Sequence, residues 1–156
     1  MTLSSYRRAF SLIELVIVVV IIGIIGAIAI PRMSRGASGA QDSAVTANLA
    51  VLRNAISLYE AEHPGTYPLV ATFVAQLTTY TDASGAAVAT KDSTHIFGPY
   101  LRTVPTLPVG ANKGSATVAA AQAAGVGWVY DATTGAIIAG TTAGEVDASG
   151  VKYNTY

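Results

Sequence analysis

Apolar and polar residues divide the chain into an apolar segment near the N-terminus and a mixed remainder. Residues 15–30 are all Leu, Ile, Val, Ala or Gly, and residues 10–30 contain a single charged side chain, Glu14. At about 1.5 Å per helical residue, the segment from residue 10 to residue 30 would extend roughly 30 Å, the thickness of a bilayer's hydrocarbon core. The pattern therefore predicts a transmembrane helix, which we place at residues 10–31.

A second helical pattern follows over residues 41–62. Its apolar positions are spaced four, three, four and three residues apart: Val45, Leu49, Leu52, Ile56 and Tyr59. This spacing forms one stripe along a helix, and we expect the stripe to pack on a C-terminal sheet of the same chain. Pro64 and Gly65 end the helix. If Gly36 and Gly39 do not interrupt it, residues 10–63 form one long helix.

A short second helix is predicted over residues 70–80. It begins near Thr72, a residue type that caps helices, and it carries Phe73, Val74 and Leu77 on one side.

Three irregular segments are also predicted. Residues 81–85 are a turn, and residues 97–108 contain three prolines and form an ordered crossing without a helix. Residues 110–125 are rich in Ala, Gly, Ser and Thr, which predicts a mobile surface loop.

Residues 127–139 show the strongest strand pattern in the chain. Aromatic and β-branched residues flank a turn at residues 132–135 that ends in glycine, which predicts a β-hairpin. Trp128 and Tyr130 share one face, where Trp128 is expected to anchor the core over the long helix. A last strand is predicted near residues 151–153. Together these elements predict an α+β fold, with a long N-terminal helix packed on a small C-terminal antiparallel β-sheet.

Composition excludes several classes of function. Charged residues make up 12% of the chain and the formal net charge is zero, so nothing in the charge pattern favours a nucleic-acid partner. The absence of cysteine excludes a disulfide framework, a thiol nucleophile and a cysteine zinc site. His63 and His95 lie far apart in the sequence and outside catalytic motifs. The chain is therefore not expected to be an enzyme.

The N-terminus allows more than one interpretation. A secretory signal peptide would use Arg7 and Arg8 as its basic region and the small residues of Ala27-Ile28-Ala29 as its cleavage site. Arg7-Arg8-Ala9-Phe10 also resembles the core of a twin-arginine export signal.

Glu14 argues against both of these interpretations. A carboxylate entering the bilayer costs about 2.5 to 3.5 kcal/mol at the centre of a helix and less near an end. Arg7 and Arg8 lie six or seven residues away, too far for an i,i+4 pair. A targeting segment that is discarded has no use for such a residue, so a new positive charge is expected to pair with it.

Residues 8–16, Arg-Ala-Phe-Ser-Leu-Ile-Glu-Leu-Val, resemble the processing site of type IV pilins and of type II secretion pseudopilins. In that family a short basic leader is cut before a Phe, the fifth mature residue is a Glu, and the twenty-second is a Pro. Counting from Phe10 places Glu14 fifth and Pro31 twenty-second. Ala9, the next smallest residue, stands where the family usually has Gly.

The resemblance implies a processing and assembly route. Prepilin peptidase would cut between Ala9 and Phe10 and methylate the new N-terminus of Phe10. The precursor would cross the inner membrane once, with its globular domain in the periplasm. It would then join an envelope or cell-surface filament of identical subunits, helped by an inner-membrane assembly platform and minor pseudopilins. Glu14 would pair with the amine of a neighbouring subunit, and Gly26 and Pro31 would provide a kink or flexible break.

Within the family we favour a major pseudopilin of a type II secretion system. The mature chain would have 147 residues (156 minus 9) and lacks the cysteine pair of many adhesive pilins. One alternative is a major or minor pilin of a type IV pilus, serving adhesion, motility or DNA uptake. A second is an exported or membrane-anchored module that does not polymerise and binds a ligand through Trp128 and Tyr130.

Calcium is a further possibility, because major pseudopilins often bind it in a C-terminal loop. The candidates here are Asp131, Glu145 and Asp147, but residues 147–150 are too sparse for an EF-hand, and a solvated turn is favoured. No cofactor is therefore predicted. The expected organisation is a leader at residues 1–9, a transmembrane and assembly helix at 10–31, an amphipathic continuation at 32–63, and a globular domain at 64–156.

Overall fold

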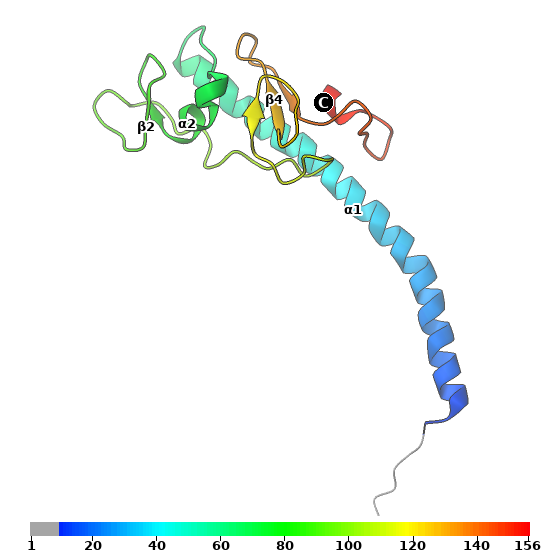
Figure 1. The fold of residues 1–156 in the computed structure, drawn as a ribbon. Coiled ribbons are helices and arrows are strands. Elements are labelled where there is room, and N and C mark those ends of the chain that lie inside the picture. Colours follow the sequence, from blue (N-terminus) through cyan, green and yellow to red (C-terminus); the bar gives the residue numbers. More distant parts are fainter. Residues whose placement is uncertain (1–9) are drawn as a thin grey trace, which may run out of the picture. The chain divides into compact units, whose positions relative to one another are not determined.

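A computed structural model of the chain describes the backbone of residues 10–156, and the side chains of residues 10–28 and 38–156. The chain divides into two compact units, Met1–Ala37 and Ser38–Tyr156. Helix α1, Leu12–Glu62, is continuous in the described backbone, including at Gly36 and Gly39, which confirms the expected long helix (Figure 1). The backbone is also helical at Gly26 and Pro31, so no melted stretch is present there in the single chain. A break in a packed filament stays a prediction.

The remaining elements are short and belong to the second unit. They are η1 (Val70–Thr72), α2 (Phe73–Thr78), β1 (Tyr80–Thr81), β2 (Ala87–Val88), β3 (Val118–Ala119), β4 (Trp128–Tyr130), β5 (Ile137–Ala139) and η2 (Tyr153–Thr155). Strands β1 and β2 form an antiparallel pair, and a second sheet has the order β3-β4-β5. In Figure 1, α2 and β4 lie alongside the C-terminal part of α1. The expected α+β fold, a long helix packed with small β-sheets, is confirmed.

The larger sheet is mixed, whereas an antiparallel sheet was expected. Strands β4 and β5 form the predicted hairpin, with Val129 opposite Ile138. Strand β3 instead pairs with β4 in parallel, with Val118 opposite Trp128. The loop over residues 120–127 carries the chain back to the same end of the sheet before β4 begins, and this return makes the pair parallel.

The core forms where α1 meets the sheet and α2. All five residues of the predicted stripe are buried, as are the following residues from the other elements: Phe73, Leu77, Leu107, Trp128, Tyr130 and Ile137. Nε1 of Trp128 donates to the carbonyl oxygen of Pro105 over 2.8 Å, so the indole keeps a hydrogen bond inside the core. Burying each large apolar side chain stabilises the fold by about 1.5 to 3 kcal/mol. The expected role of Trp128 as a core anchor agrees with this packing.

Several local predictions were wrong. Phe73 and Leu77 are buried one turn apart, but Val74 is 50% exposed because it follows Phe73 by about 100° around the helix. The β1–β2 hairpin was not predicted. Residues 110–125 were expected to form a mobile loop, yet they contain β3 and are held by Asn112, whose amide bonds three carbonyl oxygens.

The last strand was also placed wrongly. Val146 and Lys152 form an isolated antiparallel bridge, and the chain then turns into η2. Tyr153 is buried and its hydroxyl donates to Oδ1 of Asp42 on α1 over 2.5 Å. That inward contact turns the chain toward the helix, so a strand does not continue.

Candidate assembly segment

Helix α1 begins with a capped turn. The carbonyl oxygen of Ser11 accepts from the N–H groups of Glu14 and Leu15 over 3.1 and 3.3 Å. In return, the N–H of Ser11 donates to Oε2 of Glu14 over 2.9 Å. Ser11 is thus the N-cap and Glu14 the third helical residue, a Ser-x-x-Glu arrangement in which the glutamate satisfies a free N–H at the helix start. A carboxylate here also faces the positive end of the helix dipole.

This cap was missed from the sequence, although its signal was present. A serine followed three residues later by a glutamate, just before an apolar run, is a pattern typical of a helix start. The partner of Glu14 in the single chain is thus the backbone N–H of Ser11, whereas a positive charge was expected.

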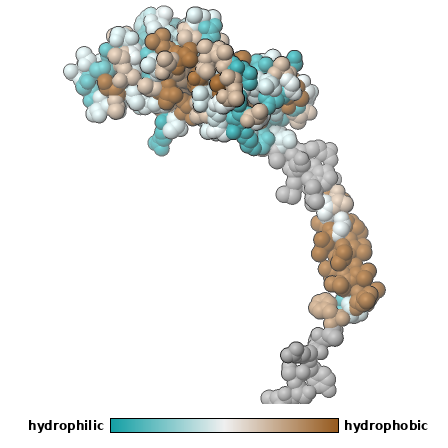
Figure 2. Space-filling model, in the orientation of Figure 1, coloured by the Kyte–Doolittle hydropathy of each residue, from teal (hydrophilic) through white to brown (hydrophobic). Residues whose placement is uncertain are grey.

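The side chains after the cap form an apolar surface. Over residues 12–28 the large apolar side chains are all exposed in the single chain, from 46% for Val18 to 79% for Leu12. Figure 2 shows this part of α1 as mostly hydrophobic. Exposed apolar area of this extent is unfavourable in water and marks a surface that another apolar environment covers.

Two glycines in this surface have no steric role within the chain. Apart from its chain neighbours and the adjacent backbone of its own helix, a Cβ atom added at Gly23 or Gly26 would have no described atom within 4 Å. Small residues on an apolar helix permit the close approach of another helix, but the assembly role expected for Gly26 stays a prediction.

The other predicted residues of this segment are placed as follows. Phe10 precedes the helix and is 83% exposed. Ala9 and the basic leader lie outside the described residues, and so does the side chain of Pro31. Within the part of the chain that the structure describes, no helix is both long enough and apolar enough to span a membrane.

The three calcium candidates each accept hydrogen bonds from other groups of the chain. Asp131 accepts from the hydroxyl and N–H of Thr133, and these bonds hold the pKa of its carboxyl below the usual range. Glu145 accepts from the N–H groups of Thr142 and Ala111, which lowers its pKa in the same way. Asp131 therefore closes its own turn, and Glu145 both closes a turn and links it to the loop of Ala111.

Asp147 is bonded similarly, near the C-terminal end of the described chain. It accepts from the hydroxyl of Tyr156 and the N–H of Val151, which together lower the pKa of its carboxyl. Among the residues described here, no three His, Asp or Glu side chains come together in a group that could hold a metal ion.

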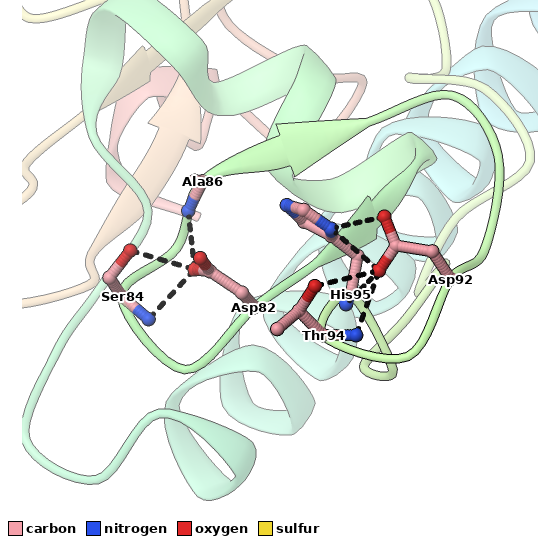
Figure 3. Close-up of polar contacts among 6 residues, drawn as sticks. All are labelled: Asp82, Ser84, Ala86, Asp92, Thr94 and His95. Carbon is pink, nitrogen blue, oxygen red and sulfur yellow. Dashed lines mark hydrogen bonds and ion pairs between the residues drawn. The ribbon is translucent and has the colours of Figure 1, made fainter.

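Two further aspartates close loops next to β1 and β2 (Figure 3). Asp82 accepts from the hydroxyl of Ser84 and the N–H of Ala86, and its pKa is lowered by these bonds. Asp92 accepts from the N–H groups of His95 and Thr94, which hold the pKa of its carboxyl far below the usual range. The ring of His95 also faces Asp92, with Nδ1 2.8 Å from Oδ2.

His63 is buried at the end of α1. Its Nδ1 lies 2.9 Å from the carbonyl oxygen of Tyr59, and its Nε2 lies 2.8 Å from the carbonyl oxygen of Asp82. The ring stacks on Tyr59 with a centroid distance of 4.0 Å. Nε2 of His63 also lies 3.3 Å from Oγ1 of Thr81, so both histidines have bonding partners within the fold.

The aromatic residues proposed to bind a ligand are inaccessible. Trp128 and Tyr130 are both 0% exposed, so neither can stack on a ligand at the surface. A cavity of about 310 Å³ lies elsewhere, between α1 and the β4–β5 turn, and its lining includes Tyr67 and Arg53. Arg53 donates there to the main-chain oxygens of Ile137 and Tyr156, over 3.2 and 2.5 Å. Its guanidinium therefore links α1 to the end of the chain.

Comparison with known proteins identifies the N-terminal segment. Residues 4–30 match the family model described as the prokaryotic N-terminal methylation motif. No curated protein and no solved structure matches the chain significantly. The matched residues include Phe10, Glu14 and the apolar surface of α1 after the cap. The chain therefore carries the prepilin-type N-terminal segment that is the signature of type IV pilins and pseudopilins.

Proposed function

We propose that the protein is the structural subunit of a pseudopilus in a type II secretion system. The observation that carries the proposal is the exposed apolar surface of residues 12–28, which begins at a capped helix start and lies within the methylation motif. A single chain leaves this surface uncovered. Lipid covers it in the precursor, and the same segments of neighbouring subunits cover it in the filament.

Processing precedes assembly in this proposal. Prepilin peptidase cuts between Ala9 and Phe10 and methylates the new amine, which keeps its positive charge. The precursor is anchored in the inner membrane with its globular unit in the periplasm. An assembly platform and minor pseudopilins then add subunits to the growing filament.

Glu14 and the small residues have separate tasks in assembly. The carboxylate of Glu14 pairs with the amine of a neighbouring subunit, because an unpaired charge in an apolar bundle is costly. Gly26 permits close helix packing, and Pro31 permits a local break of the helix in the filament.

The globular unit serves as a structural head without catalysis. His63 is buried against main-chain oxygens and the buried hydroxyl of Thr81, and His95 contacts Asp92, which supports this part of the proposal. No bound cofactor is proposed, since Asp131, Glu145 and Asp147 already accept hydrogen bonds from groups of the chain. Addition of calcium or a chelator is expected to leave the melting temperature of the purified protein unchanged, and a clear calcium-dependent rise would contradict this.

Mass spectrometry of the protein extracted from membranes tests the processing step. We expect a chain that begins with methylated Phe10. A chain that begins at Ile30 would indicate a signal peptide, and one that begins at Met1 would indicate an uncleaved anchor. Either of these results refutes the proposal.

Two further measurements test filament assembly and distinguish a type II secretion system from a type IV pilus. The Glu14→Gln variant is expected to insert and to be cleaved but to yield few filaments in sheared-cell fractions. Normal filament yield would refute the pairing. Deletion of the gene is expected to abolish export of secreted enzymes; loss of surface pili, motility or DNA uptake with normal export would instead assign the subunit to a type IV pilus.

A further inference from the structure

The cap of α1 gives Glu14 a partner before any second subunit arrives. Its Oε2 already accepts from the N–H of Ser11, which lies at the helix start of the same chain. Among the described residues, Oε1 has no hydrogen-bond donor, so one oxygen of the carboxylate is still available. When a second subunit approaches, the carboxylate of Glu14 therefore already holds one hydrogen bond within its own chain.

Cleavage would place a positive charge beside that carboxylate. The new α-ammonium group belongs to Phe10, the residue directly before Ser11. The Cα atoms of consecutive residues are about 3.8 Å apart. The ammonium of Phe10 is therefore within reach of the Glu14 carboxylate, which already contacts the N–H of Ser11. Rotation of the new terminus is unrestricted by a preceding peptide bond, and opposite charges attract strongly in apolar surroundings.

We propose that, in the processed but unassembled subunit, Glu14 caps its own helix at Ser11 and neutralises the ammonium of its own Phe10. Entry into the filament then exchanges this intrachain pair for the amine of a neighbour. The inference rests on the proposed function, because it needs the cleavage before Phe10. It changes the role of Glu14: assembly replaces one ion pair with another, and the free subunit holds no unpaired charge in the membrane.

The cap can be tested with amide hydrogen exchange at Ser11 in the full chain in detergent. Glutamine at position 14 keeps an oxygen that accepts from the N–H, whereas leucine has none. Exchange at Ser11 is expected to be about tenfold faster in Glu14→Leu than in the unmodified chain, and nearly unchanged in Glu14→Gln. Glu60→Leu, the same change in the last turns of α1, is the matched control and is expected to leave Ser11 unaffected. Equal exchange rates in all four proteins would refute the cap.

The intrachain ion pair is tested by measuring the reactivity of the Phe10 amine. The processed protein, in detergent, is treated with an amine-acylating reagent near neutral pH, and the modified Phe10 is quantified by mass spectrometry. A paired ammonium reacts slowly, so Glu14→Gln is expected to react several-fold faster than the unmodified chain. This difference should persist on dilution, because an intrachain pair does not depend on protein concentration.

The outcomes separate this inference from the proposed function. A difference in acylation that disappears on dilution would show pairing between subunits only and would refute the intrachain pair. A persistent difference in a protein that forms no filaments in cells would support the pair and contradict the filament function. If no chain begins at Phe10, both the proposed function and the amine pairing are refuted. Hydrogen exchange at Ser11 still tests whether Glu14 caps the helix.

Discussion

Replacing Asn112 with alanine tests what orders the segment between the proline-rich crossing and β4. Asn112 is 9% exposed, and its Nδ2 donates to the carbonyl oxygens of Ala123, Val126 and Gly140 over 2.8 to 3.0 Å. Its Oδ1 accepts from the N–H of Gly125 over 2.9 Å. The side chain thus ties three stretches of backbone together.

The expected loss of stability follows from these four contacts. The two Nδ2 hydrogens make at most two full bonds and share the third acceptor, so the substitution removes about three hydrogen bonds. Each buried group left without a partner costs about 1 to 3 kcal/mol, which predicts a loss of about 3 to 5 kcal/mol after partial entry of water. Most small domains have a total stability of about 5 to 15 kcal/mol, so the effect is large.

Denaturation of the full chain in detergent measures this loss. Trp128, the only tryptophan in the sequence, is buried in the core, and its fluorescence reports the unfolding of the second unit. With a urea dependence of about 1 to 3 kcal/mol per molar, the midpoint should fall by at least about 1 M. Asn48→Ala is the matched control: its Nδ2 makes one exposed bond to Thr106, which predicts a loss of about 0.5 to 1.5 kcal/mol. Similar losses in the two variants would refute the reasoning.

Two other predictions concern pH and turn geometry. The lowered pKa values of carboxyls such as Asp92 and Asp131 mean that the unfolded chain binds more protons in acid. Their contribution to stability is thus complete above the unfolded pKa of about 4 and is lost as the pH falls through the folded values. Thermal melts should show a falling melting temperature below about pH 5, and a constant value down to pH 3 would contradict this. Gly135→Ala should destabilise more than Gly125→Ala in the same urea assay. Both glycines have positive φ angles, +71° and +80°, but only at Gly135 does the added Cβ meet a side chain, 2.6 Å from the ring of Tyr67. Equal losses would show that the contact with Tyr67 contributes nothing.

Elements with strong periodicity were predictable from the sequence. The apolar stripe of α1 and the alternation around Trp128 each bury one face, and both patterns extend over enough residues to fix the packing. Phe10, Glu14 and the apolar run also predicted the prepilin-type segment that the comparison identifies.

Features that depend on single side chains were not predictable in the same way. Residues 110–125 lack periodicity, and their order comes from Asn112, whose partners lie up to 28 residues away in sequence. The burial of Tyr153 depends on Asp42 at the other end of the fold. The cap at Ser11 differs from these cases, because its pattern is local and could have been recognised.

The contacts of Asp42 and Arg53 with the end of the chain also constrain when the second unit can finish folding. Asp42 bonds the hydroxyl of Tyr153 across 111 residues, and Arg53 bonds the main-chain oxygen of Tyr156 across 103. Contacts between such distant residues form late, because a long loop must close first. During synthesis the N-terminal residues emerge first, so α1 is complete long before its final partners exist. Until residues 153–156 arrive, Asp42 and Arg53 lack these partners, so the core of the second unit is completed only by the last segment to be synthesised.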